Sequence, residues 1–156
     1  ALQCGGSHLF NPTKMTLPFT IKNELGEVSL REDTKAKTIT GWGRKFLYSQ
    51  LLLGDSVDNY SPTALVAKDN PHKRFGDVGC FNLLNKLNTD EDCLKAIVEQ
   101  YKKWYNEPVT FTSHDGNEYT YTWLDAANEI WTLARMKRFV GDDIAFGDVL
   151  TKFGIS

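Results

Sequence analysis

An amphipathic helix over residues 89–105 is the feature that most constrains the fold of this chain. Thr89 stands at the N-cap position, and Asp92 follows three residues later, as in a capping box. One apolar stripe runs along the helix and must be buried against other elements. The stripe consists of Leu94, Ile97, Val98 and Tyr101, and continues to Trp104 or Tyr105.

The composition is that of one soluble domain with a core. The chain has 156 residues, of which 41% are hydrophobic and 24% charged, which argues against a disordered tail or a long repeat array. The longest uncharged apolar run, 51–53, is far below the roughly 20 residues that cross a bilayer. Residues 1–10 have neither a basic start nor an apolar core of a signal peptide. We therefore expect a cytoplasmic protein with no membrane partner.

Residues 44–105 are predicted to contain two further helices. Apolar residues recur at helical spacing over 46–53, and Gly54 follows as a stop signal. A glycine turn over 76–79 opens a second apolar pattern, which predicts a short helix over 81–87.

The remaining segments are predicted to be extended, apart from one last helix. Residues 1–43 read as irregular chain with extended pieces, including a hairpin over 16–30. Apolar residues alternate over 109–123 around an Asp-Gly turn, which predicts a β-hairpin. Thr122 is the predicted cap of the last long helix. The fold is expected to be mainly α, of the α+β class, in a single domain 1–156.

The cysteines and histidines indicate no zinc site or disulfide framework. Cys4, Cys80 and Cys93 are odd in number and have no C-x-x-C spacing, so we expect reduced, buried thiols. The three histidines are scattered and lack neighbours at ligand spacing.

Two carboxylates follow the helix that ends at Gly54. Asp55 and Asp58 stand three residues apart, and in a helical turn they would face the same way. Magnesium binds through one or two carboxylates completed by water and substrate phosphate, so the pair is a candidate Mg²⁺ (or Mn²⁺) site. The alternative is structural: Gly54 ends the helix, Asp55 or Ser56 caps the next turn, and Asp58 is solvated.

Residues 54–59, Gly-Asp-Ser-Val-Asp-Asn, resemble the Gly-Asp-x-x-Asp-Asn signature of the 5′ nuclease family. That family includes the 5′→3′ exonuclease domain of bacterial DNA polymerase I, phage exonucleases and flap endonucleases. Residues 75–84 look like its Gly-x-Gly hairpin and following helix, within a helix-hairpin-helix DNA-binding element. The helix over 88–105 resembles the next helix of phage members, and residues 2–8 resemble the stretch after the second acidic cluster.

The resemblance implies that this chain is the C-terminal portion of a phage-type enzyme. The family gathers further carboxylates from a preceding half, and residues 60–74 intervene where members usually run directly into the glycine hairpin. By resemblance, Asp55 and Asp58 are catalytic ligands of the second metal. The metal-ligand turn and the hairpin element lie within residues 44–105. A β-hairpin and C-terminal helices follow in residues 106–156. Alone, the chain is expected to be inactive, its partner being an N-terminal nuclease half in the same precursor or in a separate chain.

DNA binding is expected to be local rather than driven by bulk charge. The net charge is −2, but residues 31–45 carry a net +3 and residues 68–86 a net +2. Backbone N–H groups at Gly76 and Gly79 are candidates for contact with a phosphate, unless these glycines only permit a tight turn. Basic runs are also typical of solvated faces. The candidate DNA-binding side chains are Arg44, Lys45, Lys68, Lys73 and Arg74.

The expected function is that of the DNA-binding part of a magnesium-dependent 5′→3′ exonuclease or flap endonuclease. Its DNA would be a 5′ flap, a nicked duplex or a duplex end, in the host cytoplasm if the gene is a phage gene. Hydrolysis would need the N-terminal half, because a two-metal centre requires more carboxylates than two. The alternatives are a stand-alone, non-catalytic DNA-binding module, and an interaction protein of phage origin in which the Asp pair only caps a turn.

Overall fold

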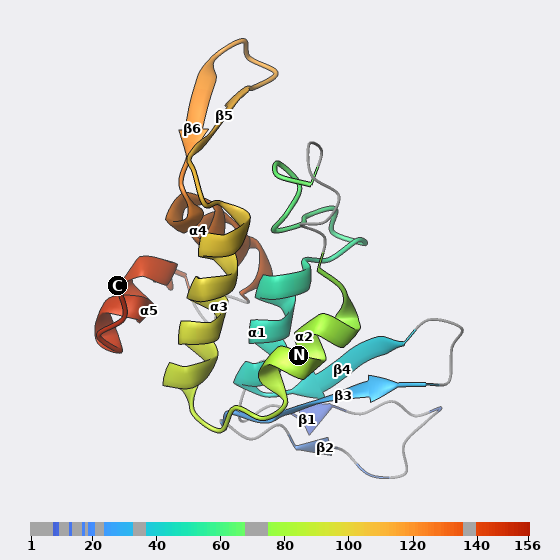
Figure 1. Cartoon of the computed structure of the whole chain (residues 1–156). Helices are drawn as coiled ribbons and strands as arrows, with labels where there is room; N and C mark the ends of the chain where they lie inside the picture. Colours follow the sequence, from blue (N-terminus) through green and yellow to red (C-terminus); the bar gives the residue numbers. More distant parts are fainter. Residues whose placement is uncertain are drawn as a thin grey trace.

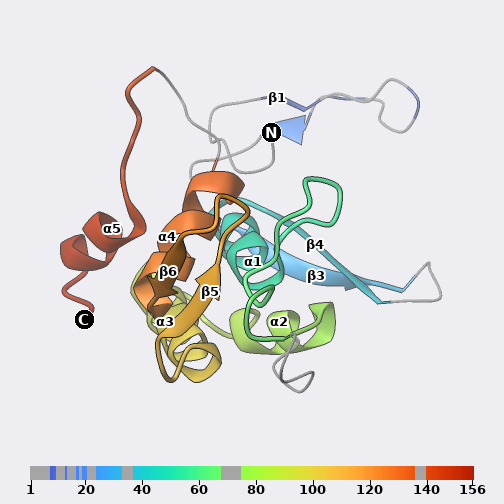
Figure 2. The same ribbon diagram turned by 90° about the horizontal axis from the view of Figure 1, so that it is seen from above.

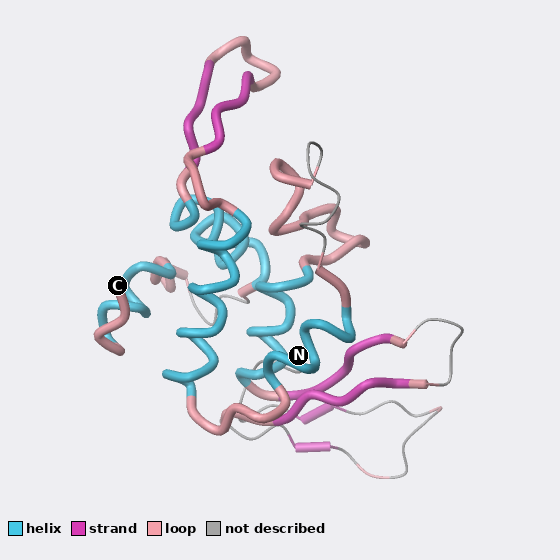
Figure 3. The backbone as a smooth tube through the Cα atoms, viewed as in Figure 1, coloured by secondary structure: helices cyan, strands magenta, loops and turns pink. Residues whose placement is uncertain are grey.

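The computed structural model describes residues 8–9, 13, 17, 19–20, 24–32, 37–67, 75–135 and 140–156. Within these residues the chain is mainly helical with short antiparallel strand pairs, which confirms the predicted α+β class (Figure 3). The helices are α1 (Arg44–Leu53), α2 (Asp77–Leu84), α3 (Asp90–Trp104), α4 (Trp123–Ala134) and α5 (Phe146–Lys152). The strands are β1 (His8–Leu9), β2 (Phe19–Thr20), β3 (Glu27–Arg31), β4 (Thr38–Trp42), β5 (Val109–Thr112) and β6 (Glu118–Tyr121).

Helix α1 lies at the centre of the fold. It contacts α2, α3 and α4 as well as both strands of the β3–β4 hairpin (Figure 1). Leu51 and Leu52 are fully buried in this helix, because it is covered on several sides rather than along one stripe. The buried Tyr101 hydroxyl of α3 donates to the Leu51 carbonyl at 2.8 Å, which fixes α3 against the C-terminal end of α1.

Both predicted helix caps are confirmed. The Thr89 hydroxyl accepts a hydrogen bond from the Asp92 backbone N–H at 3.1 Å, at the start of α3. At the start of α4, the Thr122 hydroxyl accepts from the Asp125 backbone, and the Asp125 carboxylate accepts from the Thr122 N–H at 2.9 Å. Each cap satisfies a backbone N–H group that has no partner inside the helix, and the reciprocal capping box is present at α4.

The predicted β-hairpin over 109–123 is confirmed, whereas the predicted hairpin over 16–30 is wrong. β5 and β6 pair in antiparallel register, with Phe111 opposite Tyr119. β3 pairs with the later strand β4, while β2 pairs with β1. Gly26 was interpreted as part of a turn between two strands. In the structure it lies where the backbone passes close to Trp42, since a Cβ there would overlap the carbonyl of Trp42.

Residues 54–67 form an irregular segment beyond the end of α1. Seen from above, this segment lies over α1 between the β5–β6 and β3–β4 hairpins (Figure 2). None of the described helices has the length and apolar character needed to cross a membrane.

Candidate metal and nucleic-acid site

The paired carboxylates lie in a closed loop that follows α1. Asp55 and Tyr60 exchange two backbone hydrogen bonds of 3.0 Å each, so residues 56–59 form a tight turn rather than a turn of helix. Gly54 enters the loop with φ +75°, and a Cβ there would overlap the Tyr60 carbonyl, so the loop requires glycine at this position. Asn59 closes the turn with φ +56°.

The Asp55 carboxylate supports its own loop. Oδ1 accepts hydrogen bonds from the backbone N–H of Val57 at 2.7 Å and of Asp58 at 3.4 Å. This agrees with the alternative in which Asp55 caps a turn. It leaves Oδ2 of the half-buried Asp55 and both oxygens of the exposed Asp58 without a hydrogen bond from the described residues.

The electrostatics of the loop also affect Tyr60. Its pKa is raised first by burial of the hydroxyl, and then by the negative charges of Asp55 and Asp58. The loop therefore concentrates negative charge at one point of the surface. A divalent cation at that point would be attracted by both carboxylates.

The loop offers carboxylate oxygens to a cation, but the described residues fall short of a two-metal centre. Carboxylate oxygens with open positions for water and phosphate are the ligands that Mg²⁺ prefers. Among the described residues there is no cluster of three or more His, Cys, Asp or Glu side chains that could hold a metal. Asp55 and Asp58 can therefore contribute to a metal site, and a complete centre needs carboxylates from elsewhere.

A pocket of about 460 Å³ joins this loop to the start of α2. Gly54, Asp55 and Ser56 line one side of it, and Phe75 and Asp77 line another. The floor comes from β4 and α1, through Thr38, Ile39, Phe46, Ser49, Gln50 and Leu53.

The start of α2 is hydrogen-bonded to strand β4. The Asp77 carboxylate accepts a hydrogen bond of 2.7 Å from the backbone N–H of Ile39 in β4. This contact ties the first residue of α2 to the β3–β4 hairpin. The N-terminus of α2 therefore has a fixed position relative to the β3–β4 hairpin.

The two candidate glycines have different surroundings. Gly79 lies inside α2, where a Cβ would be 3.2 Å from the Phe75 ring, so close packing explains it. Gly76 is the exposed N-cap of α2, with φ −115° and ψ 172°, and a Cβ there would meet nothing within 4 Å. Any L-residue can adopt this conformation, so neither backbone geometry nor packing requires glycine at position 76.

The predicted basic residues divide into two groups. Arg44 forms an ion pair with Asp90 at 2.8 Å, and the buried Lys45 donates to the Asn85 carbonyl at 3.3 Å. Both stand at the N-terminal end of α1, about 15 Å of helix away from Asp55, and neither lines the pocket beside it. The structure therefore does not bring Arg44 and Lys45 to this site. Lys68, Lys73 and Arg74 lie outside the described residues.

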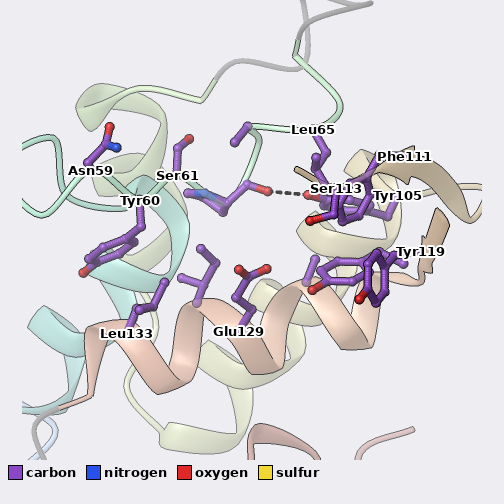
Figure 4. Close-up of a pocket in the computed structure, with 15 residues that line it drawn as sticks. Asn59, Tyr60, Ser61, Leu65, Tyr105, Phe111, Ser113, Tyr119, Glu129 and Leu133 are labelled. Carbon is purple, nitrogen blue, oxygen red and sulfur yellow. Dashed lines mark hydrogen bonds between the residues drawn. The ribbon is translucent and has the colours of Figure 1, made fainter. Parts of the chain in front are cut away.

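A second pocket, of about 450 Å³, was not anticipated from the sequence. It lies between residues 59–65, the β5–β6 hairpin and α4, and it is rich in tyrosine (Figure 4). Alternation of Phe111, Tyr119 and Tyr121 was a local signal for an aromatic face on the hairpin. Nothing local indicated that Tyr60 and Glu129 would join that face.

The loop, the start of α2 and the pocket between them form the candidate site. Comparisons of the chain with protein-family models, with curated proteins and with solved structures found no match.

Proposed function

We propose that this chain is the DNA-binding, metal-ligand part of a magnesium-dependent 5′→3′ exonuclease or flap endonuclease. The observation that carries the proposal is the shared pocket of Asp55 and the start of α2. Asp55, one of the two candidate cation ligands, and the residues on either side of Gly76 at the start of α2, Phe75 and Asp77, line one concave surface. A DNA backbone passing over this surface would contact both.

The metal argument starts from the oxygens that the loop leaves available. Oδ2 of Asp55 and the carboxylate of Asp58 would hold one Mg²⁺ or Mn²⁺, with water and DNA phosphate as further ligands. The cation would supply Lewis-acid stabilisation of charge on the phosphate. Other carboxylates must come from a partner half, so the proposal assigns no hydrolysis to this chain alone.

Gly76 stands at the exposed N-terminus of α2, where a DNA phosphate would approach. The fold itself has room for a side chain at this position. A side chain there would, however, obstruct a phosphate that approaches the first N–H groups of α2, which would explain the glycine. Because the net charge of the chain is −2, binding should be weak, and because it depends on phosphate contacts it should decrease as salt is raised.

Substitutions at Gly76 separate this role from stability. Asp is a strong N-cap residue and favours the positive end of the helix dipole, so Gly76→Asp should keep or raise the free energy of unfolding. The same carboxylate would repel a phosphate. Binding of a 5′-flap duplex at low salt should therefore weaken about tenfold, roughly 1.4 kcal/mol. Gly76→Asn is the matched control, which caps the helix without adding charge and should weaken binding less.

Two results would overturn the proposal. One is no detectable binding of the flap duplex, a nicked duplex or a duplex end at low salt. The other is an affinity that Gly76→Asp leaves unchanged, because the start of α2 would then make no phosphate contact.

The non-catalytic DNA-binding module remains the second candidate, and the hydrogen bonds within the Asp55 loop favour it. In that case the Asp55 carboxylate only stabilises the turn, and Asp58 is solvated. DNA binding would be the same with and without Mg²⁺, and Asp58→Asn would not alter it. The nuclease proposal instead expects Mg²⁺ to strengthen binding and Asp58→Asn to remove that gain.

A further inference from the structure

The tyrosine-rich pocket is built from three separate parts of the chain. Tyr60 comes from the loop after α1, Tyr105 follows α3, and Phe111 and Tyr119 belong to the β5–β6 hairpin. The Tyr105 hydroxyl donates to the Pro62 carbonyl at 2.9 Å, which joins the loop to the end of α3. Two walls of the pocket are therefore joined by a tertiary hydrogen bond.

The aromatic wall on the hairpin is ordered by its own ring contacts. Phe111 stacks on Tyr119 with ring centroids 6.0 Å apart and meets Tyr121 edge-on at 5.1 Å. The opposite face of the same hairpin is polar, with the Thr110 and Thr120 hydroxyls 3.0 Å apart. The aromatic face thus points toward α4 and the pocket.

Among the described residues that line this pocket, the exposed Glu129 is the one carboxylate. Figure 4 shows Glu129 projecting from α4 between Tyr60 on one side and Tyr105, Phe111 and Tyr119 on the other. Its charge raises the pKa of Tyr121, and adds to the effect of burial in raising the pKa of Tyr105 to about 12. None of the described residues that line the pocket is Lys, Arg or His, so these residues supply no cation to neutralise Glu129.

The fold leaves this pocket partly open. Tyr119 is 42% exposed and Leu133 is 54% exposed, although both are large side chains on its wall. Asp55 and Asp58 add negative charge beside Tyr60. A phosphate or carboxylate ligand would be repelled here, whereas a flat organic cation would gain from the rings and from the carboxylate.

We propose that this pocket binds a guanidinium group of the kind that an arginine side chain carries. Glu129 would accept its N–H groups, and the rings of Tyr60 and Tyr119 would contact its faces. A guanidinium is favoured over an ammonium because it is planar, stacks on aromatic rings and donates a pair of parallel hydrogen bonds to a carboxylate. This inference goes beyond the proposed nuclease role and does not depend on it.

The test titrates the full chain with N-acetyl-arginine amide, without DNA or magnesium, and follows amide resonances of the pocket by NMR. Saturable shifts in the millimolar range are expected, confined to residues near the pocket. The neutral isostere N-acetyl-citrulline amide should bind at least tenfold more weakly, and the lysine analogue should fall between them. Glu129→Gln should weaken arginine binding about tenfold, and Tyr119→Leu several-fold.

Glu118→Gln is the matched control, because Glu118 is an exposed glutamate of β6 outside the pocket and its loss should not change the affinity. Thermal unfolding of each variant verifies that it is folded. Two probes separate the sources of the guanidinium: agmatine represents a free small cation, and a short peptide with a central arginine represents a protein partner. Tighter binding of the peptide assigns a protein source, and equal binding assigns a small cation.

Three outcomes would overturn the inference. They are no saturable shift with the arginine amide, equal binding of the citrulline amide, and an unchanged affinity in folded Glu129→Gln. None of these bears on DNA binding, so failure here and failure of the nuclease proposal are distinguishable.

Discussion

Arg44 donates two hydrogen bonds to the carboxylate of Asp90, from Nε to Oδ1 at 2.8 Å and from Nη2 to Oδ2 at 2.9 Å. The Tyr48 hydroxyl donates a third, to Oδ1 at 2.7 Å. Asp90 is the first residue of α3, so two turns of α1 are fixed to the start of that helix. Arg44, which was a candidate for DNA contact from the sequence, therefore stabilises the packing of α1 against α3.

This cluster predicts a pH-dependent loss of stability. Burial alone would raise the pKa of Asp90, but the hydrogen bonds from Arg44 and Tyr48 outweigh it and lower the pKa below its usual value. Because the folded pKa is depressed, the stabilisation is complete above the unfolded pKa of about 3.9 and is lost as the pH falls through the folded value. Urea unfolding across this pH range measures it.

Asp90→Asn is the variant that isolates the effect. At neutral pH it should lower the free energy of unfolding by about 1–3 kcal/mol, since Arg44 is 38% exposed and solvent screens part of the interaction. Its deficit relative to the wild type should shrink in acid. A deficit that stays constant from neutral pH down to about pH 2 would contradict the assignment.

The capping box of α4 gives a second prediction. Thr122→Ala removes the hydroxyl that accepts from Asp125 and should cost about 1 kcal/mol in the free energy of unfolding. Thr132→Ala is the matched control, since Thr132 is exposed within the same helix, where alanine is favoured. Equal stability of the two variants in thermal unfolding would count against the cap.

The buried thiols give a third prediction. Burial raises the pKa of Cys80 to about 12 and that of Cys93 to about 11, so neither forms the reactive thiolate at neutral pH. In a Cys4→Ser background, alkylation by iodoacetamide should be slow in the native state and should accelerate with urea. Rapid labelling of the native chain, at the rate seen in denaturant, is the result that this account does not allow.

Local signals in the sequence predicted α1, α3, α4 and the β5–β6 hairpin, whereas they placed α2 a few residues late and missed the pairing of β3 with β4. Thr89 and Thr122 were identifiable because a cap acts over three residues. The pairing of β3 with β4 was missed because Gly26, conspicuous between two extended runs, looked like a turn. Its role, close approach to the Trp42 carbonyl, depends on a later strand.

The candidate site was only partly predictable for the same physical reason. The Gly54–Asn59 motif is contiguous, so its carboxylates could be found, but whether its turn was helical depended on the Asp55–Tyr60 backbone pairing. Arg44 and Asp90 are 46 positions apart in the sequence, so no local pattern indicated that Arg44 would form an ion pair within the fold. The same holds for Glu129 and Tyr60, which only the tertiary fold places in one pocket.

The central claim is that Asp55 and Asp58 hold a divalent cation, and Mn²⁺ tests it most directly. Substoichiometric Mn²⁺ added to the isotope-labelled chain broadens the amide resonances of residues near the bound ion. The turn at Asp115 is an internal reference. Its exposed carboxylate also accepts a hydrogen bond from a backbone N–H of its own turn, that of Asn117, but this turn contains no second aspartate.

The account predicts selective broadening of residues 55–60, stronger than at the Asp115 loop. Excess Mg²⁺ should reverse it, and the double variant Asp55→Asn, Asp58→Asn should abolish it. Broadening that is equal at the two loops, or that survives in the double variant, would contradict the claim.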